Sequence, residues 1–114
     1  MKINTPDDYQ RFAERTMNSD LTFDEKMSML GMGLSGEAGE VTDYLKKVVY
    51  HKHPFSGETL SKELGDVLWY ITNLANENGL TLVEIMQENI DKLIERYPDG
   101  FSTEDSLTRR DIDG

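Results

Sequence analysis

The sequence contains no cysteine among its 114 residues. This absence excludes disulfide bonds, thiolate metal ligands and cysteine nucleophiles together. The sequence also lacks any apolar run near the ~20 residues that a membrane-spanning helix needs. Its first residues, MKINTP, contain no apolar signal segment. We therefore expect a cytoplasmic protein that does not enter a membrane.

Basic residues are also few. The chain has 12 lysines and arginines against 22 aspartates and glutamates, a formal net charge of −10 at pH 7. A surface with this charge is poorly matched to the phosphates of DNA or RNA, so we expect no nucleic-acid partner. The charge does not exclude a small anionic ligand that meets cations or metal ions gathered at one place.

Alternating, strand-like segments are absent as well, whereas apolar residues recur at helical spacing in four segments. The expected helices cover roughly residues 5–18, 22–50, 56–78 and 81–97, with capping residues such as Thr22 and Thr81 at their starts. We predict one all-α, four-helix bundle-like domain over residues 1–104. Residues 105–114 are polar and charged, and we expect them to form a loosely ordered tail.

One stretch matches a familiar pattern by chance. Residues 31–36, GMGLSG, fit the G-x-G-x-x-G pattern of dinucleotide-binding folds. That site needs a strand before the glycines, and residues 23–30 have no strand character. We therefore reject the dinucleotide-binding interpretation.

Two of the expected helices each carry a pair of acids three residues apart, Glu37 with Glu40 and Glu63 with Asp66. Residues at this spacing lie on one face of a helix. Glu37 also takes the missing step in an apolar stripe, whose other members are Leu30, Leu34, Val41, Leu45 and Val48. A carboxylate directed into a core is costly unless a partner or a metal ion compensates it. The pattern therefore predicts a functional site.

Four carboxylates held together would repel one another and raise one another's pKa values. Mg²⁺ relieves this repulsion and prefers oxygen ligands, and Mn²⁺ is the natural substitute. Zinc fits less well because no cysteine or well-placed histidine is available. A di-iron site would need Glu-x-x-His pairs. His51 and His53 lie in an expected loop, where they either bind a metal or phosphate or are simply exposed.

The fourth expected helix carries Asn89, Lys92 and Arg96 along one flank, between its apolar stripe and an acidic outer face. Two cations beside an amide suit a phosphate chain and a polar ligand group. The alternative is that they form surface ion pairs with residues such as Glu88. Apolar residues outside the main stripes predict self-association as a homodimer or homotetramer. These residues are Trp69, Val83 and Ile94.

The pattern Glu37-x-x-Glu40 followed by Glu63-x-x-Asp66 resembles the signature of the MazG-like, all-α nucleoside triphosphate pyrophosphohydrolases. The flanking sequences GEAGEV (36–41) and ELGDVLWY (63–70) strengthen the resemblance, which covers roughly residues 25–101. So do the closing residues Asn89, Lys92, Arg96, Tyr97, Pro98, Gly100 and Phe101. The N-terminal helix lies outside the match, so the choice of base stays open.

The resemblance implies Mg²⁺-dependent hydrolysis of a nucleoside triphosphate to the monophosphate and pyrophosphate by a metal-activated water. It implies that the metal ligands are Glu37, Glu40, Glu63 and Asp66. It further implies that Lys92 and Arg96 meet phosphates, that Asn89 lies near the nucleoside, and that sites lie near the subunit contacts of a dimer or tetramer.

Three questions stay open after the sequence analysis. Either Glu37 or Glu40 can accept a proton from the attacking water. The substrate can instead be phosphoribosyl-ATP, which a related pyrophosphohydrolase cleaves with the same metal chemistry. A third alternative is an acidic helical interaction module without catalysis.

Overall fold

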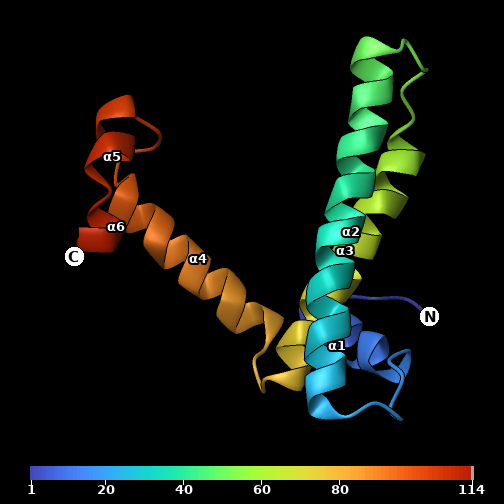
Figure 1. Ribbon diagram of the computed structural model, residues 1–114. Helices are drawn as coiled ribbons and strands as arrows, with labels where there is room; N and C mark the ends of the chain where they lie inside the picture. Colours follow the sequence, from blue (N-terminus) through green and yellow to red (C-terminus); the bar gives the residue numbers. More distant parts are fainter. Residues whose placement is uncertain (114) are drawn as a thin grey trace.

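The computed structural model describes residues 1–113, which form six helices and no strand (Figure 1). The helices are α1 (Pro6–Arg15), α2 (Phe23–Tyr50), α3 (Gly57–Glu77), α4 (Leu82–Arg96), α5 (Thr103–Thr108) and α6 (Arg110–Asp113). This architecture confirms the all-α prediction. In the described residues no helix is long and apolar enough to cross a membrane.

Side chains before each long helix determine where it begins. Thr22 precedes α2, where its hydroxyl accepts a hydrogen bond from the N–H of Glu25 at 3.2 Å. The Glu25 carboxylate accepts one in return from the N–H of Thr22 at 2.9 Å. The same reciprocal capping box precedes α1 at Thr5 and α4 at Thr81, and Ser56 caps α3. These caps satisfy backbone donors that have no partner within the helix, so the sequence placed the helix starts correctly.

Helices α2 and α3 run side by side and form the main packing contact of the chain (Figure 1). The ring of Tyr70 on α3 lies directly against the backbone of α2 at Gly33, so closely that a Cβ at residue 33 would overlap it. At the far end of the pair, the hydroxyl of Tyr44 accepts a hydrogen bond from the N–H of Ser56 at 2.6 Å. One contact in the middle and one at the end therefore hold the register of the two helices.

Polar side chains join α1 to α3 and to the beginning of α4. The amide of Gln10 donates to Asn76 Oδ1 at 2.9 Å and to the Leu80 carbonyl at 2.8 Å, and its oxygen accepts from the N–H of Leu82 at 2.9 Å. The indole N–H of Trp69 donates to Thr16 Oγ1 at 2.7 Å. Trp69 is therefore half-buried and bound to the end of α1, so it is less free than the sequence suggested.

Beyond its first turn, α4 extends away from the α2–α3 pair (Figure 1). The radius of gyration is 17.3 Å, against about 13 Å for a compact domain of this length. Most apolar residues of α4 are consequently exposed, which we expected for Val83 and Ile94. The exposed apolar residues of α4 are Val83, Met86, Ile90, Leu93 and Ile94.

The C-terminal segment differs from its prediction. We expected residues 105–114 to form a loosely ordered tail, but helices α5 and α6 cover most of the segment up to Asp113 and pack against α4. Gly114 lies outside the described residues. The cause is an ion pair between Asp111 of this segment and Arg96 of α4, which a search for apolar periodicity cannot find.

The contact between Gly33 and Tyr70 predicts opposite outcomes for two glycine substitutions in α2. Gly33→Ala should destabilise the protein by ~1–3 kcal/mol because the new methyl group displaces the Tyr70 ring. Gly36→Ala is the matched control, since nothing lies within 4 Å of a Cβ there, and it should stabilise the helix by up to ~1 kcal/mol. Urea unfolding of the two variants measures the difference. Equal stability would mean that the Tyr70 ring moves aside freely.

Candidate metal centre

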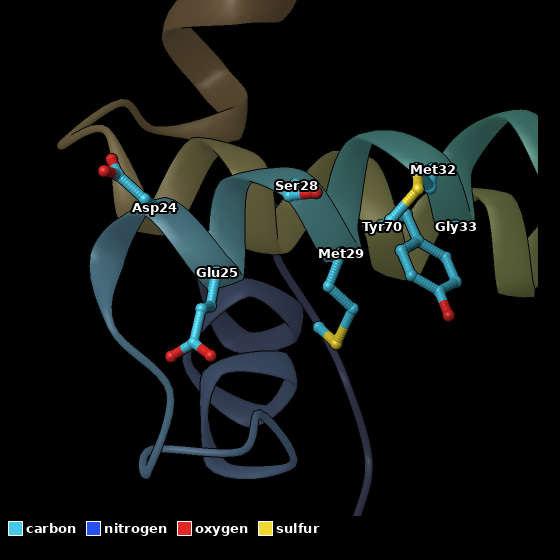
Figure 2. A pocket seen from close by; sticks show the side chains of 7 residues that line it. All are labelled: Asp24, Glu25, Ser28, Met29, Met32, Gly33 and Tyr70. Carbon is cyan, nitrogen blue, oxygen red and sulfur yellow. The ribbon is translucent and has the colours of Figure 1, made fainter.

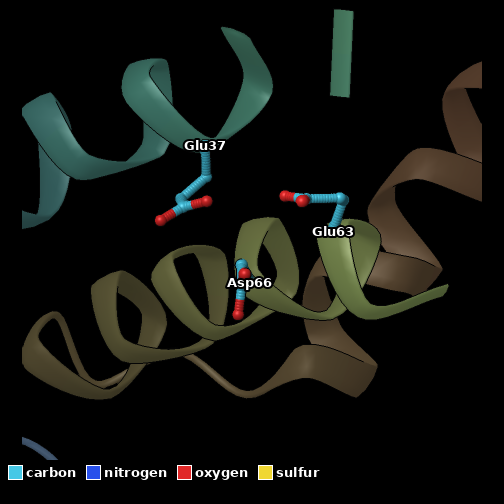
Figure 3. A group of neighbouring side chains, drawn as sticks. All are labelled: Glu37, Glu63 and Asp66. Carbon is cyan, nitrogen blue, oxygen red and sulfur yellow. The ribbon is translucent and has the colours of Figure 1, made fainter. Parts of the chain in front are cut away.

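Three of the four predicted acids meet between α2 and α3. Carboxylate oxygens of Glu37, Glu63 and Asp66 all lie within 4.8 Å of one another. Glu37 points from α2 toward α3, where Glu63 and Asp66 occupy neighbouring turns (Figure 3). Glu37 and Glu63 are half-buried and Asp66 is exposed, so the cluster opens to solvent on one side. We refer to these three residues as the acidic cluster.

The acidic cluster carries negative charge, and none of its three carboxylates forms an ion pair with another described residue. Burial first, and then the charges of Asp66, Glu63 and Glu40, raise the pKa of Glu37 above its ordinary value. The nearest lysines in the sequence are engaged elsewhere, because Lys46 and Lys47 pair with Asp43 and Lys62 pairs with Glu58. A divalent cation would relieve this repulsion, and three carboxylate oxygens are a donor set that Mg²⁺ and Mn²⁺ prefer. The residues present therefore fit such a metal ion.

The fourth predicted acid, Glu40, lies outside the acidic cluster. It is exposed, one helical turn beyond Glu37 on α2. Its charge still contributes to the raised pKa of Glu37, so the two carboxylates are close enough to interact. His51 and His53 are exposed at the distant end of α2 and take no part in the cluster.

The predicted phosphate-binding residues do not join the cluster within this chain. Asn89, Lys92 and Arg96 lie on the part of α4 that extends away from α2 and α3 (Figure 1). Asn89 and Lys92 are exposed. Arg96 is bound by Asp111, with Nε at 2.8 Å from Oδ1 and Nη2 at 2.6 Å from Oδ2. Sequence reasoning missed this partner because it lies in the segment that was expected to be loose.

Aromatic residues that the sequence analysis did not assign to the site lie beside the acidic cluster. A cavity of about 350 Å³ is lined by Glu37, Asp66, Trp69 and Tyr70. Tyr70 also lines a second cavity of about 680 Å³ along the first half of α2 (Figure 2). The signal was present in the sequence, because residues three and four positions after Asp66 lie on its face of α3.

Comparison with known proteins identifies relatives of this chain. The family model for the MazG nucleotide pyrophosphohydrolase domain matches residues 25–101. The gene 37 protein of Mycobacterium phage L5 is 39% identical over 80 residues, which cover 67% of this chain and 70% of that protein. No solved structure matches. The region matched by the family model contains the acidic cluster, both aromatic residues of the adjacent cavity and α4.

The raised pKa of Glu37 predicts how the metal-free protein responds to pH. A carboxyl group whose pKa is higher in the folded than in the unfolded state destabilises the fold when it ionises. Glu37→Gln should therefore raise the melting temperature at pH 7 without metal. This gain should shrink as the pH falls from the raised pKa to the ordinary value of 4.5.

With added Mg²⁺ the wild type should melt at a higher temperature than Glu37→Gln, because the ion stabilises the wild-type cluster more than the variant. Thermal denaturation at several pH values, with and without Mg²⁺, measures both effects. Glu88→Gln on α4 is the control, since it removes an exposed acid outside the cluster. If Glu37→Gln and Glu88→Gln change the melting temperature equally at every pH, the acidic cluster is not destabilised by repulsion between its carboxylates.

Proposed function

This chain belongs to the MazG nucleotide pyrophosphohydrolase domain family, and we propose that it hydrolyses nucleoside triphosphates to monophosphates and pyrophosphate with Mg²⁺ as its cofactor. The observation that carries the proposal is the acidic cluster beside an aromatic-lined cavity. A nucleotide offers a negatively charged polyphosphate and a flat base. The acidic cluster, with a bound cation, matches the polyphosphate. The aromatic-lined cavity matches the base.

Glu37, Glu63 and Asp66 would hold the cation, with Mn²⁺ as a substitute. When bound, the cation supplies Lewis-acid chemistry, since it offsets charge on phosphate oxygens and makes water acidic enough to attack near neutral pH. Glu37 and the α3 acids approach from opposite helices, so the α2–α3 packing fixes their separation before any ligand arrives. This preorganisation lowers the cost of ordering the site at the moment of binding.

We assign the proton acceptor to Glu40. It lies outside the three-carboxylate cluster and is exposed, so its oxygens remain free when the other three carboxylates hold the cation. A carboxylate beside the attacking water can take its proton and so raise the rate by ~10²–10⁴-fold. Glu37, which the sequence left as an equal candidate, would be engaged as a metal ligand.

Trp69 and Tyr70 form the apolar side of the proposed nucleotide site. Their rings meet edge to face with centroids 4.9 Å apart, and Tyr70 is held in place by its contact with Gly33. A rigid aromatic surface gives a base a stacking partner at low entropic cost. It also excludes water from one side of the cluster, which strengthens the electrostatic interactions there.

A second copy of the chain would supply the cations. Lys92 and Asn89 lie on α4, which extends away from α2 and α3 (Figure 1), and most apolar residues of this helix are exposed. Ile94, for example, is 60% exposed. An apolar stripe of this kind marks a surface for another protein. A homodimer or homotetramer that covers it can place Lys92 of one copy beside the acids of another, in keeping with the sites near subunit contacts that the family resemblance implies.

A nucleotide panel tests the proposed reaction directly. Pyrophosphate release from ribo- and deoxyribonucleoside triphosphates is measured with Mg²⁺ and with EDTA, and phosphoribosyl-ATP is included as a substrate. Mg²⁺-dependent release from a nucleoside triphosphate supports the proposal. Pyrophosphate release from phosphoribosyl-ATP alone would show that the site hydrolyses that substrate instead. No turnover of any substrate would favour the non-catalytic interaction module.

Two conservative variants separate the roles of the acids. Glu40→Gln and Asp66→Asn should each lower kcat by ~10²–10⁴-fold. Only Asp66→Asn should also abolish the rise in melting temperature that Mg²⁺ causes, because only it removes a metal ligand. Steady-state kinetics and thermal denaturation measure the two effects. A Glu40→Gln variant that no longer responds to Mg²⁺ would make Glu40 a fourth ligand.

A mixing experiment tests the shared site. Lys92→Ala alone should reduce kcat/KM by ~10–1000-fold. Refolded together in equal amounts, Lys92→Ala and Asp66→Asn should recover about a quarter of wild-type activity, because half of the dimers are mixed and one of their two sites is intact. Asp66→Asn mixed with Glu63→Gln is the control and should recover nothing. A monomer in light scattering, or no recovery in the first mixture, would contradict a site shared between copies.

A further inference from the structure

The C-terminal segment binds the side chain that is expected to meet substrate phosphate. Arg96 lies at the end of α4, and both oxygens of Asp111 accept hydrogen bonds from its Nε and Nη2. The Asp111 side chain is completely buried, and that of Arg96 is only 20% exposed. Arg109 adds a further contact to Asp111 at 3.4 Å. No other ion pair in residues 1–112 involves a fully buried carboxylate.

Asp111 occupies the guanidinium as a phosphate would. Arginine binds carboxylates and phosphates through the same pair of parallel N–H groups. While Asp111 holds Nε and Nη2, that edge of Arg96 is closed to another anion. The ion pair also keeps the pKa of Asp111 far below its ordinary value, so Asp111 stays charged at physiological pH. A change of pH near neutrality does not open the contact, whereas a competing anion can.

Little apolar packing holds the segment in place. Leu107 and Ile112, its two large apolar side chains, are 81% and 64% exposed. The ion pair between Arg110 and Asp105 joins residues within the segment and adds no link to α4. Segments with few buried apolar contacts open at low free energy. The contact between Arg96 and Asp111 is thus the main polar attachment of α5 and α6, and its loss releases them.

We infer that Asp111 is an internal competitor of substrate phosphate at Arg96, so that residues 103–112 act as an autoinhibitory latch. This inference rests on the proposed function, in which Arg96 meets phosphate. The substrate must displace the Asp111 carboxylate before it gains the Nε and Nη2 edge of the arginine. The apparent affinity for the substrate is then the intrinsic affinity multiplied by the fraction of molecules in which the latch is open. Once the substrate is bound, the latch is open, so turnover of the bound substrate is unaffected.

Asp111→Asn tests the latch in the full-length protein. The variant weakens the grip on Arg96 and should lower KM for the nucleoside triphosphate by about tenfold while kcat stays near its wild-type value. Asp105→Asn is the matched control, because it removes the same charge from the same segment but leaves Arg96 bound to Asp111. The control should keep the wild-type KM. An unchanged or higher KM in Asp111→Asn would overturn the latch, since Asp111 would then only orient Arg96.

Hydrogen exchange on the wild type tests the same inference without a substitution. Amides of residues 103–112 should exchange several-fold faster when inorganic pyrophosphate and Mg²⁺ are added, because the anion displaces Asp111. Unchanged or slower exchange would overturn the latch. The readout needs no turnover, so it separates the two ideas. A chain that hydrolyses nucleotides without this acceleration keeps its function and loses the latch, and one that shows acceleration without hydrolysis keeps the latch and loses the reaction.

Discussion

The amide of Gln10 joins α1 to the end of α3 and the beginning of α4. Both of its polar atoms are bonded, to Asn76 and Leu80 at the end of α3 and to Leu82 at the beginning of α4. Only four apolar residues are buried among the described residues, and two of them are alanines, so a polar group with all its partners in place specifies a single arrangement that such a small apolar core would not. The direction in which α4 leaves the other helices follows from it. So does the exposure of the apolar stripe on α4, and with it the expectation of a second copy.

The acidic cluster depends on a different constraint, the close approach of α2 to α3. Glycine weakens a helix, and α2 has several glycines in its centre. At Gly33 the missing side chain admits the Tyr70 ring, and this contact sets the spacing at which Glu37 faces the acids of α3. The helix gives up intrinsic stability at the same place where the carboxylates repel each other. A conflict of this kind between local stability and the assembled structure is typical of functional sites.

Features that depend on residues close together in the sequence were predicted correctly. Contacts between residues far apart in the sequence were missed. The capping boxes at Thr22 and Thr81 need only residues three positions apart, so the helix starts were correct. The pairing of Glu63 with Asp66 is likewise local. The course of α4 depends on bonds from Gln10 to residues about seventy positions away, and no periodicity reveals them. Asp111 was missed because one ion pair, and no apolar stripe, orders its segment.

The two charged parts of the proposed site have opposite electrostatic problems. The acidic cluster gathers three carboxylates, so the metal ion that we propose there would relieve their repulsion. Arg96 already has a carboxylate partner, so phosphate gains only the difference between two similar anions. If the proposed cation holds the phosphate, that binding must therefore supply the free energy that opens the contact on α4. In this proposal metal binding becomes a condition for engaging Arg96, which couples the α2–α3 pair to the far end of α4.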